Sequence, residues 1–190
     1  MRSRSIALLL LTLLLALSLS GCAPQSAPEE DAADDAVLLG FSQLGRESAW
    51  RMGNSRDIQE AAERAGVQLM YDNAQQEQEN QIKAIRSFIA YQVDVIAFAP
   101  IVEQGWDTVL TEARDAGIPV LLTDRFIVTD DPSLYVGYVG ADFLAEGRRA
   151  GKFLVEKADR EGLDDLKIVE LSGTLSSTPM QQRSSGFREM

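Results

Sequence analysis

The chain has 190 residues, with 29 acidic and 18 basic side chains, a formal net charge of −11 and no histidine. Its lysines and arginines form no basic stripe, so the composition argues against a nucleic-acid partner. With no histidine and a single cysteine, Cys22, the chain lacks the usual soft ligands for zinc or a redox metal, and we expect no cofactor.

Residues 1–21 have the layout of a secretory signal peptide. Arg2 and Arg4 precede an apolar run from Ile6 to Leu17. Spanning a bilayer core takes roughly 20 apolar residues, whereas a run of about 10 to 14 is typical of a signal peptide. A transmembrane anchor is the alternative interpretation, and the length of the run argues against it.

The sequence Leu19-Ser20-Gly21-Cys22 matches the lipobox of bacterial lipoproteins, in which the cysteine is diacylated and becomes the mature N-terminus. The alternative is a stray cysteine beside an ordinary cleavage site. Stable anchoring takes more than one acyl chain, so lipidated Cys22 would hold the protein on a membrane surface. Residues 22–36 contain no large apolar side chain that could drive ordering of the backbone, which predicts a disordered acidic tether.

From Val37 onward, short β-like runs alternate with segments of helical periodicity, which predicts an α/β fold with a Rossmann-like parallel sheet. The predicted strands cover residues 37–41, 67–71, 95–99, 118–122, 134–139 and 166–171. The apolar stripes of the predicted helices run from Ile58 to Ala65, from Ile82 to Ile89, from Trp106 to Ala113 and from Phe143 to Val155. Helix-ending glycines are expected at Gly66 and Gly117, an N-cap at Asp142, and close helix packing at Gly147 and Gly151.

The predicted elements fall into two lobes. Residues 37–140 would form the first lobe, and a second begins near Ala141. The chain stops at Met190, inside a predicted helix that covers residues 181–187. One strand and two helices cannot cover both faces of their own sheet, which predicts that residues 141–190 are the start of an incomplete lobe in a fragment of a longer chain.

Two clusters of polar side chains follow predicted strands, where ligands bind in open α/β sheets. The first cluster contains Ser42, Gln43, Glu47, Ser48, Trp50 and Arg51, the second contains Asp124 and Arg125, and Asp72 follows another strand. Carboxylates accept hydrogen bonds from sugar hydroxyls, guanidinium groups donate to them, and an aromatic ring covers the apolar face of the sugar. The clusters therefore predict a sugar site, in which Asp124 and Arg125 can compensate one another.

Each of these features also has a purely structural interpretation. Glu47 and Arg51 have the i, i+4 spacing of a surface ion pair, and Trp50 can face the core. Asp124 and Arg125 can belong to an ordinary turn. The polar run over residues 73–81 is interpreted as the solvated start of a helix, without ligand contacts.

Several segments, in order, resemble the sugar-binding proteins of ABC importers, which belong to the type I periplasmic binding protein family, and in particular those that bind galactofuranose. The segments are GFSQ at 40–43, ESAWR at 47–51, QENQIKAIRSF at 78–88 and LTDR at 122–125, and the resemblance runs from Val37 to the end. It implies two lobes that close on a monosaccharide, which is then delivered to a permease in the membrane.

The resemblance also implies roles for individual residues. Residues 47–51 would line the cleft, with Trp50 over the sugar face, while Asp124 and Arg125 would bind its hydroxyls. Arg183 matches the second-lobe arginine of these proteins. Ala49 stands where a glycine is usual, which leaves the loop slightly less free.

The leading hypothesis is a monomeric solute receptor that performs no covalent chemistry, because the chain has no G-x-S-x-G motif, phosphate-binding loop or metal cluster. A sugar-responsive transcription regulator would need a DNA-reading helix pair in front of the lobes. A sugar hydrolase is disfavoured because each candidate carboxylate has an arginine partner that keeps it ionised. The sequence does not separate an importer's receptor from one that serves a membrane sensor kinase or chemoreceptor.

Overall fold

The computed structural model describes residues 36–190. The predicted signal peptide, Cys22 and almost all of the predicted tether lie outside the described residues, so these three features stay predictions. In the part that the structure describes, no helix has the length and hydropathy needed to cross a bilayer.

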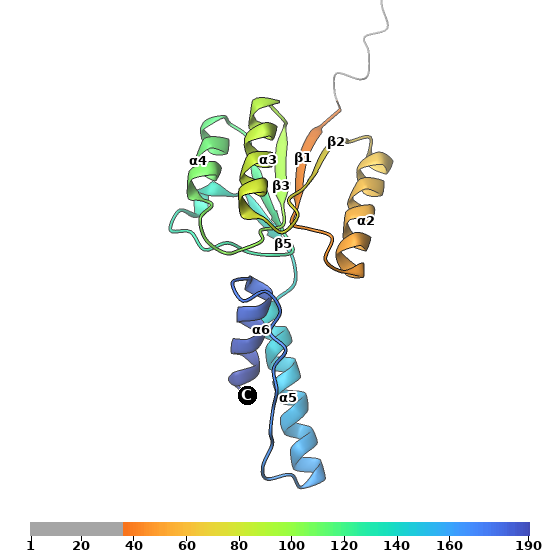
Figure 1. Ribbon diagram of the computed structural model, residues 1–190, viewed down its shortest axis with the longest axis vertical. Coiled ribbons are helices and arrows are strands. Elements are labelled where there is room, and N and C mark those ends of the chain that lie inside the picture. Colours follow the sequence, from red (N-terminus) through yellow and green to blue (C-terminus); the bar gives the residue numbers. More distant parts are fainter. Residues whose placement is uncertain (1–35) are drawn as a thin grey trace, which may run out of the picture. The chain divides into compact units, whose positions relative to one another are not determined.

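A five-stranded parallel sheet forms the centre of the fold (Figure 1). Its strands are β1 (Leu38–Gln43), β2 (Gln68–Asn73), β3 (Val95–Phe98), β4 (Val120–Thr123) and β5 (Gly137–Val139). Their order is β2-β1-β3-β4-β5, so the direction of strand addition reverses between β1 and β3. Ligands of open α/β sheets bind at such a reversal, beyond the carboxyl ends of the strands. The predicted fold class and the first five predicted strands are confirmed.

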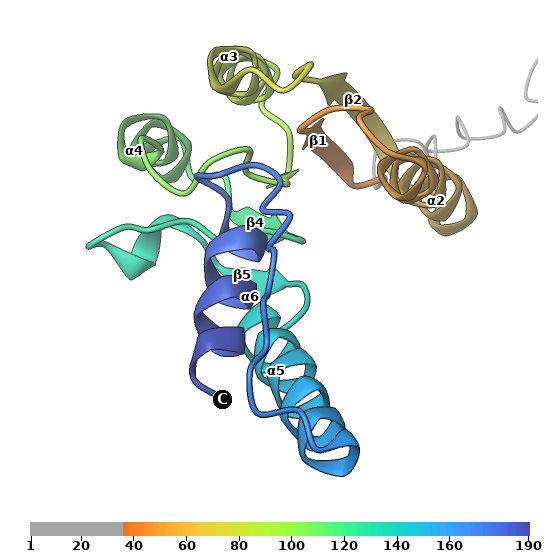
Figure 2. The ribbon, with the colours of Figure 1, turned by 60° about the horizontal axis from the view of Figure 1, so that its bottom comes forward.

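Three helices connect these strands: α2 (Ala49–Ala65), α3 (Gln78–Ala90) and α4 (Asp107–Asp115). Right-handed crossovers place α3 and α4 together on one face of the sheet and α2 on the other (Figure 2). The predicted glycine stops are confirmed, with φ of 68° at Gly66 and 76° at Gly117. The stripe predicted for α2 is only partly buried, because Ala62 is buried and Ile58 half-buried while Ala61 and Ala65 are exposed.

The hydrophobic core lies mainly between the sheet and the helices α3 and α4. Its largest fully buried side chains include Ile85, Ile96, Phe98, Trp106 and Leu110. Phe98 and Trp106 pack with ring centroids 4.9 Å apart, and the Trp106 indole donates to the Val102 carbonyl at 2.8 Å. The core thus fixes the carboxyl end of β3 and the loop that follows it.

The chain then forms α5 (Phe143–Glu161) and α6 (Thr178–Arg188), which pack against each other. The predicted N-cap is confirmed, because Asp142 Oδ1 accepts from the Ala145 amide at 2.9 Å. The predicted close packing is confirmed as well: a Cβ built on Gly147 would overlap the Arg183 carbonyl, and one on Gly151 would lie 2.7 Å from the Phe187 carbonyl oxygen.

The strand predicted over residues 166–171 is wrong. This segment has no regular structure, and its Val169 and Leu171 are 86% and 95% exposed. β-Branched and aliphatic residues favour a strand only where a neighbour supplies the ladder, and no strand within residues 36–190 pairs with this segment. It borders a mainly aliphatic cavity of about 780 Å³ beside α5 and α6. The predicted lobe boundary near Ala141 stays a prediction.

Candidate ligand-binding site

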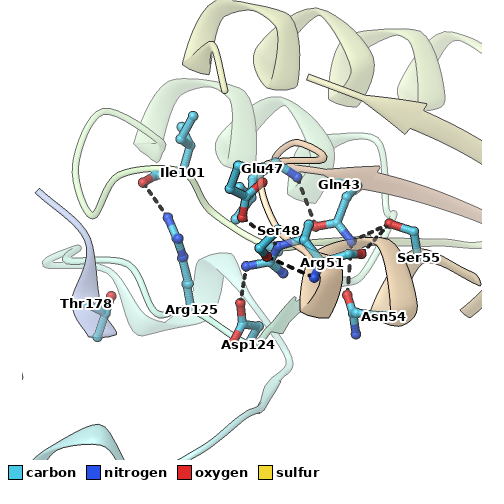
Figure 3. Close-up of polar contacts among 12 residues, drawn as sticks. Gln43, Glu47, Ser48, Arg51, Asn54, Ser55, Ile101, Asp124, Arg125 and Thr178 are labelled. Carbon is cyan, nitrogen blue, oxygen red and sulfur yellow. Dashed lines mark hydrogen bonds and ion pairs between the residues drawn. The ribbon is translucent and has the colours of Figure 1, made fainter. Parts of the chain in front are cut away.

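Four charged side chains from two distant segments meet at the carboxyl end of the sheet (Figure 3). Glu47 and Arg51 follow β1, whereas Asp124 and Arg125 follow β4. Arg51 donates from Nη2 to Asp124 Oδ2 at 2.7 Å and from Nε to Glu47 Oε1 at 3.3 Å. Parallel strands end at the same edge of the sheet, and this brings the two predicted clusters together.

The pairing inside this cluster differs from the one expected from the sequence. The structure pairs Asp124 with Arg51, which lies 73 positions away, rather than with the neighbouring Arg125. Arg125 instead donates from Nη1 to the Ile101 carbonyl at 3.1 Å. Asp124 has a positive φ of 60°, so the chain turns sharply between the two side chains. The charge of Asp124 is thereby directed at α2.

Arg51 is buried, which distinguishes it from a simple surface partner of Glu47. Its residue exposure is 3%, and the exposed fractions of the Asp124 and Glu47 side chains are 20% and 28%. Two arginines and two carboxylates sum to zero charge, so the cluster suits a neutral polar ligand better than an ionic one. The i, i+4 spacing of Glu47 and Arg51 is real, but Asp124 provides the shorter contact.

Two guanidinium nitrogens in this cluster are buried and have no hydrogen-bond partner within residues 36–190: Arg51 Nη1 and Arg125 Nε. The hydroxyl oxygen of Ser42, in β1, is also buried and has no hydrogen-bond partner within residues 36–190. Burial and the positive charge of Arg51 lower the pKa of Arg125, while Asp124 and Glu47 act in the opposite direction. Buried donors without acceptors are costly, so these nitrogens are suited to donate to an acceptor on a ligand.

A partly buried polar network fixes the first turns of α2, and thus Arg51. Ser48 is the N-cap, and its Oγ accepts from the Arg51 amide at 3.1 Å. Gln43 is fully buried and donates from Nε2 to Asn54 Oδ1 at 2.9 Å and to Ser55 Oγ at 3.1 Å. Ser55 Oγ in turn donates to the Arg51 carbonyl at 2.9 Å. The side chains of Ser48 and Gln43 therefore have structural roles in this arrangement.

Trp50 does not face the core, so that interpretation is wrong. The residue is 59% exposed, and the Arg51 guanidinium carbon lies 4.7 Å from the centre of its ring. Ala49, the first residue of α2, is exposed beside it. An exposed indole next to the buried guanidinium of Arg51 can cover the apolar face of a ligand that this group binds.

Arg183 makes no hydrogen bond to this cluster in the described part of the chain. It lies on α6, where its Nε donates to Glu146 Oε2 at 2.8 Å and its guanidinium carbon lies 4.6 Å from the ring centre of Phe143. The start of α6 does contact the loop after β4: Thr178 Oγ1 accepts from the Phe126 amide at 3.2 Å and donates to its carbonyl at 2.8 Å.

Gln81 supports the loop after β3, and the sequence interpretation missed it. The run 73–81 was expected to be solvated, yet Gln81 is fully buried. Its Nε2 donates to the Ala99 carbonyl at 2.8 Å, and its Oε1 accepts from the Ile101 amide at 3.0 Å. It precedes Ile85 by four residues on the apolar stripe of α3, and this spacing was the available signal. The Ile101 carbonyl, which accepts from Arg125, is held in place by this side chain.

These features define a class of protein: an open parallel α/β sheet that carries a charge-neutral cluster of polar side chains at its switch point, where ligands of such sheets bind. Residues 39–190 match the family described as "Periplasmic binding protein domain", and the chain belongs to this family.

Its relatives include several sugar-binding proteins. The chain is 45% identical over 153 residues to the galactofuranose-binding protein YtfQ of Escherichia coli (strain K12), which covers 80% of this chain and 47% of the relative. A Mycobacterium smegmatis protein in complex with β-D-fucofuranose has a TM-score of 0.78 and 50% identity, over 81% of this chain and 50% of that one. The binding protein of the arabinose ABC transporter from Shewanella sp. ANA-3, bound to α- and β-L-arabinofuranose, has a TM-score of 0.76 and 45% identity, over 80% and 49% of the two chains. The chain thus spans about half the length of these relatives.

Proposed function

We propose that this protein is a monomeric, extracytoplasmic solute-binding protein that captures a monosaccharide and delivers it to the permease of an ABC importer. The observation that carries the proposal is the charge-neutral cluster with two buried, unpartnered guanidinium nitrogens in the described part of the chain, Arg51 Nη1 and Arg125 Nε. A sugar supplies hydroxyl and ring oxygens that accept from such donors without adding charge.

The proposed site assigns one task to each charged side chain. Arg51 and Arg125 donate to oxygens of the sugar, while Asp124 and Glu47 accept from its hydroxyls through the oxygen atoms that Arg51 leaves free. Both guanidinium groups are already held by protein acceptors, so little side-chain entropy is lost when a sugar binds. This preorganisation favours tight binding.

The remaining site residues complete the enclosure. Trp50 covers the apolar face of the sugar, and Ser48 and Ala49 form the adjacent wall of the cleft. Arg183 would donate a hydrogen bond to the sugar from a second lobe that begins near Ala141. To do so it would give up part of its contact with Glu146. Closure of two lobes over the ligand buries most of a small solute.

The sugar is proposed to be bound in its furanose ring form, as galactofuranose or as a related hexose or pentose. Three relatives with at least 45% identity bind galactofuranose, β-D-fucofuranose and L-arabinofuranose according to their descriptions. A furanose and a pyranose direct their hydroxyls differently, and a site that donates from fixed nitrogens distinguishes them.

Calorimetric titration of the full-length protein tests sugar and ring form together. D-Galactose, D-fucose and L-arabinose equilibrate between ring forms in water, whereas their methyl pyranosides are locked. We expect at least one free sugar to bind and the matching methyl pyranoside to give no heat. The proposal fails if none of the free sugars binds, and the furanose assignment fails if a locked pyranoside binds as tightly.

Arg125→Ala is the site variant for this titration, with Arg86→Ala as the control. A hydrogen bond from a charged group is worth about 1.5–3 kcal/mol, so Arg125→Ala should weaken binding about 10-fold to 150-fold. Arg86 lies on the exposed side of α3, paired with Glu112, and its loss should leave affinity unchanged. Uptake of labelled sugar by cells with and without the protein separates import from delivery to a sensor kinase or chemoreceptor.

The proposed location is the periplasm or cell surface, with Cys22 as a diacylated N-terminus that anchors the protein to a membrane. The periplasmic family supports the compartment, and the Leu19–Cys22 motif behind an apolar run supports the anchor. Mass spectrometry of the membrane fraction should detect a lipid-modified N-terminal peptide that starts at Cys22. A mature chain that starts elsewhere and stays in the soluble fraction contradicts the anchor.

A further inference from the structure

The turn at Asp124 is strained. Asp124 is a non-glycine residue with a φ of 60°, and the Arg125 amide donates to the Thr123 carbonyl at 2.6 Å across it. A positive φ at the centre of such an i to i+2 bond is the pattern of a γ-turn, which is rare and strained. Strain of this kind persists only where the surrounding structure holds it. Since Asp124 and Arg125 both leave this turn, its geometry sets the directions of two charged groups in the site.

Strand β5 holds both backbone polar groups of Asp124. The Asp124 amide donates to the Val139 carbonyl at 2.8 Å, and the Tyr138 hydroxyl donates to the Asp124 carbonyl at 2.9 Å. Burial, followed by the charges of nearby carboxylates such as Asp124 and Asp142, raises the pKa of Tyr138, which keeps its hydroxyl protonated as a donor.

The same hydroxyl reaches the crossover that leads into α5. Tyr138 Oη lies 3.2 Å from the Ala141 carbonyl oxygen, directly before the Asp142 N-cap. A phenol has one proton, so the two carbonyls share a single donor. The hydroxyl therefore links the turn at Asp124 to the start of the following helix.

Two neighbours allow Tyr138 to take this position. A Cβ built on Gly140 would overlap the Tyr138 hydroxyl, so glycine at this position leaves the space that the hydroxyl occupies. The ring packs edge-on against Phe126, with centroids 5.3 Å apart and planes at 88°. Phe126 is in turn bonded through its backbone to Thr178.

We propose that Tyr138 is a positioning residue of the sugar site: its hydroxyl holds the strained turn that directs Asp124 toward Arg51 and Arg125 toward Ile101, and Gly140 provides the space for it. This inference rests on the proposed function for its effect on affinity. The hydrogen bond from the Tyr138 hydroxyl to the Asp124 carbonyl can be measured in the absence of sugar.

The test compares Tyr138→Phe and Gly140→Ala with a matched control, Tyr135→Phe. Tyr135 also packs edge-on against Phe126, with centroids 5.5 Å apart, and its hydroxyl has no hydrogen bond to any residue that the structure describes. We expect the carbonyl ¹³C signal of Asp124 in the sugar-free protein to shift upfield in the two test variants and to stay in place in the control.

Affinity is then measured by titration with the free sugar that the wild-type protein binds. The loss of one hydrogen bond should weaken binding about threefold to tenfold in each test variant, and the double variant should be no weaker than the weaker single variant. An unchanged Asp124 carbonyl signal overturns the proposal, and so does a shifted signal with unchanged affinity. If the wild-type protein binds no sugar, the proposed function fails, and the carbonyl signals alone decide whether Tyr138 holds the turn.

Discussion

Replacing Arg51 with methionine tests the charge cluster at the carboxyl end of the sheet, because the substitution keeps most of the side-chain volume and removes the charge. Arg51 is 3% exposed and holds two carboxylates that come from different segments. Without it, Asp124, whose side chain is 20% exposed, and the more exposed Glu47 lose their common partner. We expect the free energy of unfolding to fall.

The magnitude follows from the individual contacts. A hydrogen bond to a charged group contributes about 1.5–3 kcal/mol, and the 2.7 Å contact with Asp124 belongs in that range. The 3.3 Å contact with the more exposed Glu47 adds about 0.5 kcal/mol. Removing Nη1, a buried donor without a partner within residues 36–190, returns about 1 kcal/mol. The net loss should be about 2 kcal/mol.

Urea unfolding followed by circular dichroism measures this loss, with Arg56→Met as the control on the same helix. Arg56 pairs with Glu60 at 3.8 Å, and the two side chains are 71% and 52% exposed, so its loss should change the free energy by less than about 0.5 kcal/mol. The reasoning is refuted if Arg51→Met destabilises by no more than Arg56→Met at an unchanged slope of free energy against urea.

Three further predictions concern stability. Gln81→Leu should cost about 2–4 kcal/mol in urea unfolding, because it leaves two backbone groups of the loop after β3 without partners, and a neutral result contradicts this role. Gly147→Ala should lower stability by about 1–3 kcal/mol, because the added Cβ overlaps the backbone of α6. The control Gly53→Ala, which adds its Cβ in open space within α2, should raise stability by about 0.5–1 kcal/mol. Equal effects of the two substitutions would refute the packing argument. A hydrogen bond and the charge of Arg86 lower the pKa of Glu112, so this contribution is present above pH 4.5 and is lost as the pH falls through the lowered pKa. Glu112→Gln should therefore flatten the acid side of the stability profile, and an unchanged profile contradicts the assignment.

The alternation of strands and helices could be predicted from the sequence because each β-α unit has its own local signals. Short apolar runs, helical stripes and the stops at Gly66 and Gly117 marked the first five strands and the helices between them. The error over residues 166–171 shows the limit of this approach. Its aliphatic side chains have strand propensity, but a strand also needs a neighbour, and the pattern of one segment does not show whether a neighbour is present.

The candidate site could be predicted only as a set of residue types at the correct end of the sheet. Its actual pairing depends on contacts between distant segments: Arg51 with Asp124, and Arg125 with the Ile101 carbonyl. Two adjacent residues of opposite charge, such as Asp124 and Arg125, suggest a local pair. The positive φ at Asp124 separates them; aspartate adopts such angles more readily than most residues, but its identity alone does not mark this position among the other aspartates of the chain.

The groups that preorganise the site also carry costs to the stability of the protein. Arg51 and Arg125 each bury a nitrogen that has no partner among the described residues. The turn at Asp124, which directs Asp124 and Arg125, is strained. An apolar residue in place of either arginine would remove a buried donor but leave its present acceptors unpaired. A ligand with neutral oxygens would supply acceptors for these nitrogens without disturbing the zero charge of the four side chains. In the proposed site the same two guanidinium groups thus contribute to folding and to ligand binding, so substitutions of Arg51 or Arg125 should lower affinity as well as stability.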